Sequence, residues 1–168
     1  MAEPRIVERD QIVLMGFSFF GDPFAASAGW TEENEIGRLW SRFMAYLMAN
    51  SQLTEVIVNP QECYEVHVTH AETAEKGDFE VFVGAEIRDA HVAPLETVVK
   101  VLPASTYAVF TLEGEQISSD WHRMIHHEWL PGSGYEADMS YGFQLYDARF
   151  KGIENLHESM LDVYAPIR

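Results

Sequence analysis

The sequence YAVFT at residues 107–111 opens the segment that decides the fold, which runs on to Phe150. Its aromatic and β-branched residues predict a strand that ends at Glu-Gly. The helical pattern that follows carries Trp121 and Trp129, and LPGSG at residues 130–134 ends it, because proline and glycine are typical of helix C-termini. Two further strands are predicted after it: FQLYDARF at 143–150 and LDVYAPI at 161–167. The segment therefore has the order strand–helix–strand–strand.

The first half of the chain has the same order of elements. A strand or two is expected at residues 6–19, with a polar break at Arg9-Asp10. Thr31 is the expected N-cap of a helix with acidic residues in its first turn. That helix is predicted from apolar residues at helical spacing: Ile36, Leu39, Trp40, Phe43, Met44 and Leu47. Further strands are predicted at 56–58, 64–69 and 79–87. Residues 95–102 are expected to lead into either a second strand pair or a single bent strand that continues through Thr111.

The two sets of elements indicate a single domain, 1–168, made of two halves at about 1–90 and 91–168. A weak internal match places Glu65 in the position of Gln144. Neither half carries enough apolar surface to fold comfortably alone, so each is expected to bury its apolar face against the other.

Composition limits the kinds of partner. The chain has 11 basic and 27 acidic residues, a net charge of −16, which disfavours direct nucleic-acid binding. Cys63 is the only cysteine, so an intramolecular disulfide is excluded. The sequence shows neither a signal peptide nor an apolar run of membrane-spanning length. We therefore expect a cytoplasmic protein without membrane contact.

Several motifs together resemble the GyrI-like family of small-molecule-binding domains, which occur alone and as effector-binding parts of AraC- and MerR-type regulators. The motifs are FVGAEI (82–87), LPASTYAVFT (102–111), HHEWLPGSGYE (126–136), FQLYDARF (143–150) and LDVYAPI (161–167). The resemblance implies an α+β fold of two pseudo-symmetric β-α-β-β halves, with antiparallel sheets, a helix in each half and a central cleft. It also implies a stand-alone member, since no helix-turn-helix precedes the domain.

The resemblance also suggests where a ligand binds. Family members that bind cationic aromatic drugs use a glutamate in the strand that matches FQLY, and here that position is Gln144. Strand alternation puts Gln144 and Tyr146 on one face, which we expect to line the cleft. Glu65 or Glu86 could supply the missing acid, with Glu86 slightly favoured; solvent exposure of both is the alternative. The full candidate ligand-binding set is Gln144, Tyr146, Tyr164, Glu86, Glu65, Tyr64, Phe82 and Trp40, of which Tyr146 and Tyr164 are the favoured walls.

The histidines indicate no metal site. His122 and His126 are spaced i, i+4, but without a further ligand this spacing more often marks a solvated helix face. His67 and His70 fall on opposite strand faces. Since no nucleophile context or phosphate loop is present either, we assign no catalytic residue, metal or cofactor.

Three functions compete at this point. The leading hypothesis is an effector-binding protein for a hydrophobic or cationic aromatic small molecule, related to regulator ligand domains but without its own DNA-binding part. The resemblance also allows a hydrolase of reactive cyclopropane-containing natural products, although Gln144 lacks the acid. A gyrase-inhibitor-like module with a basic protein partner is the third.

Overall fold

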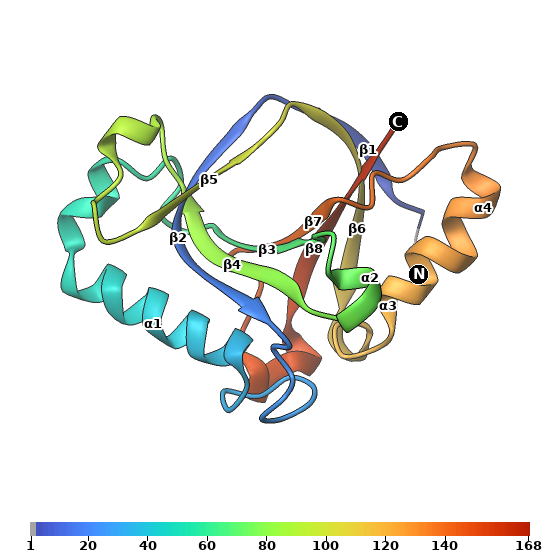
Figure 1. Cartoon of the computed structure of the whole chain (residues 1–168), viewed down its shortest axis with the longest axis horizontal. Helices are drawn as coiled ribbons and strands as arrows, with labels where there is room; N and C mark the ends of the chain where they lie inside the picture. Colours follow the sequence, from blue (N-terminus) through green and yellow to red (C-terminus); the bar gives the residue numbers. More distant parts are fainter. Residues whose placement is uncertain (1–2) are drawn as a thin grey trace.

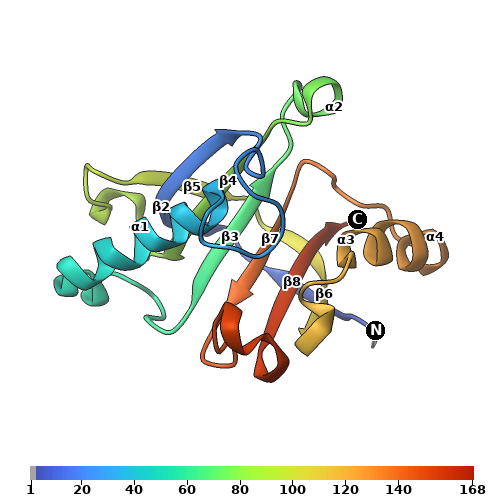
Figure 2. The same ribbon diagram turned by 90° about the horizontal axis from the view of Figure 1, so that it is seen from below.

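The two halves meet in the middle of one antiparallel sheet, whose outer face carries the helices (Figure 1; Figure 2). The computed structural model describes residues 3–168. The strands are β1 (Arg5–Arg9), β2 (Ile12–Gly21), β3 (Cys63–Val68), β4 (Phe79–Glu86), β5 (Val98–Leu102), β6 (Ser105–Glu113), β7 (Tyr141–Tyr146) and β8 (Met160–Ile167). Their order in the sheet is β1-β6-β8-β7-β3-β4-β2-β5. The α+β fold with two similar halves is confirmed, and pairing of β3 with β7 joins both halves in one sheet.

The register of the strands shows the pseudo-symmetry residue by residue. Glu65 on β3 lies opposite Gln144 on β7. On the other side of each strand, Glu65 is the register partner of Val83 on β4, and Gln144 is the register partner of Val163 on β8. The weak internal match in the sequence thus corresponds to equivalent places in the sheet, with Glu65 and Gln144 directly opposed at its centre.

The first strand of each half pairs with the other half. β1 pairs with β6, and β5 pairs with β2. Only Asp10 and Gln11 separate β1 from β2, so the chain passes here from the second half of the sheet to the first. The connection from β5 to β6 runs beside it and passes from the first half to the second (Figure 1). The polar break predicted at Arg9-Asp10 is the point of this crossing.

Strand alternation divides the apolar side chains between the two faces of the sheet. The inner face, under the crossing strands, buries Tyr64, Phe82, Tyr107 and Phe143. The outer face has two clusters. One packs Val83 and its neighbours against α1 (Glu35–Ala49), and the other packs Val163 and its neighbours against the second helix.

The beginning of α1 differs from the prediction. Asn34 caps the helix, because its Oδ1 accepts a hydrogen bond of 3.0 Å from the Gly37 amide. The Thr31 hydroxyl accepts instead from the Glu33 amide in the preceding turn, at 3.2 Å. Gly37 lets this turn fold onto the helix, since a Cβ there would lie 2.3 Å from the Thr31 carbonyl oxygen. The expectation that Thr31 is the N-cap was therefore wrong.

The second helix is not a regular α-helix. It begins as α3 (Trp121–Arg123) after the N-cap Asp120, continues as the π-helical segment η4 (Met124–Trp129), and ends as α4 (Leu130–Ser133). Gly134, in the left-handed region with φ 79°, terminates it at the predicted place. The wider turn of a π-helix changes which side chains share a face.

Several shorter elements complete the chain. They are η1 (Ser51–Glu55), α2 (Thr73–Lys76), η2 (Ala90–Val92), η3 (Gly114–Gln116) and η5 (Ile153–Glu158). The strand expected at 56–58 is reduced to a bridge between Ile57 and Ile87. The strand expected at 143–150 ends at Tyr146, since Asp147 Oδ1 accepts from the Arg149 amide in a tight turn. Within residues 3–168, no helix has the length and apolar character needed to cross a membrane.

Candidate functional site

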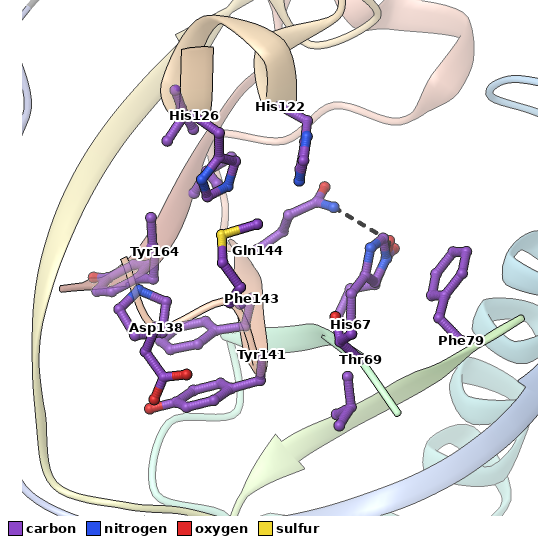
Figure 3. Close-up of a pocket in the computed structure, with 18 of the residues that line it drawn as sticks. His67, Thr69, Phe79, His122, His126, Asp138, Tyr141, Phe143, Gln144 and Tyr164 are labelled. Carbon is purple, nitrogen blue, oxygen red and sulfur yellow. Dashed lines mark hydrogen bonds and ion pairs between the residues drawn. The ribbon is translucent and has the colours of Figure 1, made fainter. Parts of the chain in front are cut away.

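A pocket of about 300 Å³ lies on the outer face of the sheet, beside the second helix (Figure 3). Its apolar lining is formed mainly by Phe79, Trp121, Ile125, Met139, Tyr141, Phe143, Val163, Tyr164, Ala165 and Pro166. Its polar lining consists of Glu65, His67, Thr69, Thr73, His122, His126, Asp138 and Gln144. The walls thus come from both halves of the chain.

The pocket forms where β7 and β8 diverge. These strands pair over three positions, ending at Phe143 opposite Tyr164. Beyond that point β8 pairs with the loop before β7, through a bridge between Ala137 and Ile167. The gap between the strands lets Phe143 and Tyr164, which belong to the inner face, reach the same pocket as Gln144.

A buried carboxylate forms the floor of the pocket. Glu65 is only 4% exposed, and its Oε2 accepts a hydrogen bond of 2.6 Å from the Trp40 indole on α1. Its Oε1 lies 2.8 Å from His67 Nε2 and accepts from the Gln144 amide at 3.3 Å. The acid therefore stands on the strand opposite Gln144, with its position fixed from both sides.

Tyr146 supports this group from behind. Its hydroxyl lies 2.9 Å from Gln144 Oε1 and 3.3 Å from Glu65 Oε2, within reach of both as a donor. Burial, together with the adjacent carboxylate, raises the pKa of Tyr146 well above its usual value. The phenol consequently stays protonated and orients both side chains.

Two histidines of the second helix cover the pocket. The ring centroids of His122 and His126 are 4.3 Å apart, and both rings project toward Gln144 (Figure 3). Burial lowers the pKa of His122; burial, with the neighbouring His122 and His127, lowers that of His126 to about 4. Both imidazoles are therefore neutral at pH 7, which removes a charge from the roof of the pocket.

A separate polar cluster occupies the inner face of the sheet. The Tyr64 hydroxyl donates to Glu86 at 2.8 Å, and Arg9 donates to Glu86 at 3.4 Å. Burial raises the pKa of Tyr64 above its usual range, partly offset by the Arg9 charge. The Arg9 guanidinium also lies 5.8 Å from the centre of the Tyr164 ring. This cluster ties β1 to the sheet and lies away from Glu65.

The structure thus divides the predicted site residues. Glu65, Gln144, Tyr146 and Trp40 come together on the outer face. Of these, Glu65 and Gln144 line the pocket, while Tyr146 and Trp40 lie behind them. Tyr64, Phe82, Glu86 and Tyr164 belong to the inner face, from which Tyr164 alone of the four reaches the pocket.

Three of the expectations about acids and walls need correction. Glu86 was favoured as the acid of the cleft, but its carboxylate points to the opposite face and pairs with Tyr64 and Arg9. Solvent exposure of Glu65 was the alternative, whereas this side chain is buried. Tyr146 and Tyr164, the favoured walls of the cleft, lie on opposite faces of the sheet. Gln144 pairs with Val163, so Tyr146 shares the face of Gln144, whereas Tyr164, the neighbour of Val163, takes the other face.

The sequence reasoning missed the histidines of the pocket. The i, i+4 spacing of His122 and His126 was interpreted as a solvated helix face, and His67 as part of no site. The apolar neighbours Trp121 and Ile125, each one position before a histidine, were the available signal that this face is half-buried. Across residues 3–168, no group of three or more His, Cys, Asp or Glu side chains is arranged to hold a metal ion.

Comparison with known proteins is consistent with this architecture. The transcriptional regulator BrlR of Pseudomonas aeruginosa is 30% identical over 167 residues, covering 97% of this chain and 54% of the regulator. The chain therefore spans about half the length of this relative. SAV2435 bound to tetraphenylphosphonium superposes with a TM-score of 0.70 at 13% identity, over 99% of this chain and 94% of the other. An integron cassette protein of Vibrio cholerae, VCH_CASS2, gives 0.62 at 18%, over 99% and 96%.

The likeness to the two solved structures concerns the fold alone, because the identities are low. The family assignment comes from the sequence, since the profile of Cass2, the integron-associated effector binding proteins, matches residues 5–167. The chain therefore belongs to the Cass2 family, within the GyrI-like group, as an effector-binding domain related to those of transcription regulators.

Proposed function

We propose that the protein binds a hydrophobic aromatic cation in the pocket above Glu65, and that this compound is its effector. The observation that carries the proposal is the buried Glu65 carboxylate at the floor of a largely aromatic pocket. A negative charge in a place of low dielectric attracts a cation more strongly than the same charge in water.

The charges around the pocket support a cationic ligand. Glu65 and Asp138 are its acidic lining residues, and within the described chain its lining includes no lysine or arginine. The pKa of Asp138 is lowered, chiefly by hydrogen bonds from Ser140, so this side chain is ionised at neutral pH. The net charge of −16 adds a long-range attraction for cations.

The walls of the pocket suit a flat or multi-ring compound. Phe143 and Tyr164 are stacked, with ring centroids 4.5 Å apart and planes inclined by 12°. Phe79 and Trp121 contribute further aromatic surface. Such surfaces bury apolar rings and attract cations through the ring quadrupole. The structure of SAV2435, which shares the fold, is bound to tetraphenylphosphonium, a compound of this kind.

Tryptophan quenching by tetraphenylphosphonium and by the neutral analogue triphenylphosphine oxide tests the proposal. We expect saturable quenching by the cation and weaker binding of the neutral compound. Glu65→Gln removes the charge but retains the size of the side chain. It should weaken cation binding by about tenfold, the loss expected for one partly desolvated charge pair.

Glu86→Gln is the matched control, because it changes the same residue type on the same sheet but on the face away from the pocket. Its affinity for the cation should equal that of the wild type. If Glu86→Gln weakens binding while Glu65→Gln does not, the ligand lies on the inner face and the proposed site is wrong.

A hydrolytic function receives less support from the geometry. It would require a tyrosine that donates a proton to the substrate beside the acid. Tyr146 is the tyrosine next to Glu65, but its hydroxyl lies behind the carboxylate and is directed at Gln144 and Glu65. Its raised pKa also makes it a weak acid.

A further inference from the structure

Of the four groups that hydrogen-bond the Glu65 carboxylate, His67 is the one that can carry a positive charge. Trp40 donates an indole N–H, Gln144 an amide N–H and Tyr146 a hydroxyl, and all three donors are neutral. His67 Nε2 lies 2.8 Å from Glu65 Oε1, and in the described part of the chain Glu65 forms no other ion pair. The charge that the floor of the pocket presents to a ligand therefore depends on whether His67 is protonated.

The geometry of this pair allows a proton to be added without any rearrangement. A carboxylate oxygen accepts hydrogen bonds, so His67 Nε2 carries the proton that points at Glu65, and Nδ1 is the position where a second proton binds. This Nδ1 is accessible to water, because among the described residues the one side-chain nitrogen or oxygen that is both buried and unpaired belongs to His126. The His67 side chain is 33% exposed, while Glu65 is buried, so protons reach the pair through His67.

The other titratable groups that face His67 keep their charge state around neutral pH. From the second helix, His122 and His126 project toward the pocket, and burial lowers the pKa of both, that of His126 to about 4 (Figure 3). From the loop before β7, Asp138 lines the pocket and is ionised, because its pKa is lowered as well. The neighbours on the remaining elements are uncharged: Phe79 on β4, Thr73 on α2 and Gln144 on β7. Since histidine ordinarily changes charge between about pH 5 and 8, His67 is the group through which the pocket gains a positive charge.

We propose that the cationic effector and a proton on His67 compete for the negative charge of Glu65, so that the effector binds when His67 is neutral and its binding releases a proton. This inference rests on the proposed function and adds its regulation by pH. With a neutral His67 the pair has one negative charge, which attracts the cation. With a protonated His67 the charges of the pair cancel, and the imidazolium repels the cation. By linkage, the proton and the effector weaken each other's binding by the same factor.

Tetraphenylphosphonium is the probe for this test, because its own charge does not change with pH. Its dissociation constant should rise about tenfold between pH 8 and pH 5.5, as expected for the loss of one partly desolvated charge pair. Titration calorimetry at about pH 6.5, in buffers that differ in ionisation enthalpy, should show that binding releases a proton. The neutral triphenylphosphine oxide should bind with nearly the same affinity at both pH values.

Two variants assign the proton to its residue. His67→Gln keeps an N–H that reaches Glu65 but takes up no proton in this pH range. Its affinity for tetraphenylphosphonium should vary little with pH, and the release of a proton should disappear. His122→Gln is the matched control on the second helix. It should release a proton near pH 6.5 as the wild type does, because the lowered pKa of His122 already leaves that ring neutral.

NMR of the wild type gives a readout that depends on no substitution. The imidazole resonances of His67 report its titration as the pH is varied. Saturation with tetraphenylphosphonium should move the midpoint of this titration down by about one pH unit, which is the same factor of ten measured from the side of the proton.

An affinity for tetraphenylphosphonium that is independent of pH, or a His67 titration that the cation does not change, overturns this inference and leaves the proposed function intact. Release of a proton that persists in His67→Gln assigns the proton to another group and also overturns it. If the wild type does not bind tetraphenylphosphonium at pH 8, the proposed function fails, and this inference fails with it.

Discussion

Trp40 donates the shortest hydrogen bond to Glu65, at 2.6 Å, and so stabilises a charge that is nearly inaccessible to water. Trp40→Phe keeps an aromatic ring against Tyr146 but removes the donor. We expect it to lower the free energy of unfolding by about 2 kcal/mol, because hydrogen bonds to charged groups contribute at this level. Urea unfolding followed by circular dichroism measures the difference.

Trp30→Phe is the control for this substitution. Trp30 also packs against an aromatic ring, that of Phe150, but donates to no carboxylate in the described residues. Its loss of stability should be clearly smaller. If the two variants lose equal stability, the indole of Trp40 acts through packing and its hydrogen bond is of minor importance.

His126 should make stability depend on pH. Its pKa in the folded protein is about 4, below the ordinary 6.5, so the unfolded chain takes up a proton first as the pH falls. Folding is then progressively weakened from about pH 6.5 down to pH 4, and this effect is absent above that window. The melting temperature of the wild type should fall more steeply across the window than that of His126→Phe.

His122, whose pKa is also lowered, contributes to the same slope in both proteins. His157→Phe serves as the control, since the His157 side chain is 70% exposed, and it should retain the wild-type slope. Identical slopes for the wild type and His126→Phe would show that the folded protein accommodates the charged imidazole.

At the scale of single residues, the sequence predicted that Glu65 and Gln144 occupy equivalent positions, but it did not predict that His122 and His126 cover the pocket. Glu65 could be aligned with Gln144 because both stand at the same place in similar strands. The choice between Glu65 and Glu86 depends on which face each side chain takes, and that follows from the register with neighbouring strands. Histidine spacing on a helix does not reveal whether a loop covers that face.

The N-terminus of α1 gives a prediction at the scale of the element. Asn34 accepts from the Gly37 amide, and its own amide donates to the Gly29 carbonyl at 2.8 Å. Asn34→Ala should destabilise the protein by about 1 kcal/mol or somewhat more, since a cap and a buried loop contact are lost together. Thr31→Ala should cost less, because this hydroxyl caps only the preceding turn. Thermal unfolding of the two variants would contradict the assignment if Thr31→Ala were the more damaging.

Elements with simple periodicity were predictable, and those shaped by tertiary contacts were not. β3, β4 and β8 lie within a residue or two of their expected bounds. The π-helical segment from Met124 to Trp129 has no signal in apolar spacing alone. β7 was expected to continue to Phe150, but Asp147 closes a turn with Arg149, and Arg149 also donates to Asp162 at 2.9 Å.

The exchange of first strands gives a prediction for the whole molecule. A chain cut between Pro94 and Leu95, the latter fully exposed, separates the two halves. Residues 1–94 lack β5 as the partner of β2, and residues 95–168 lack β1 as the partner of β6. We expect neither fragment to unfold cooperatively by itself, and an equimolar mixture to regain a cooperative thermal transition by circular dichroism. Cooperative unfolding of one fragment alone would show that this half is an independent unit.

The sequence indicated two similar halves but not this exchange. Order of elements along the chain shows repetition, whereas pairing of β1 with β6 joins residues about a hundred positions apart. Such pairing depends on the curvature of the whole sheet, which no local pattern encodes.

The opposition of Glu65 and Gln144 at the centre of the sheet has a consequence for ligand orientation. Two identical residues there would make the two ends of the binding site equivalent, and a compound with one charged end could enter in either of two directions. With an acid on one strand and an amide on the other, the two directions differ in energy. The binding site of this pseudo-symmetric fold therefore has two chemically different ends, and an asymmetric compound binds in one orientation.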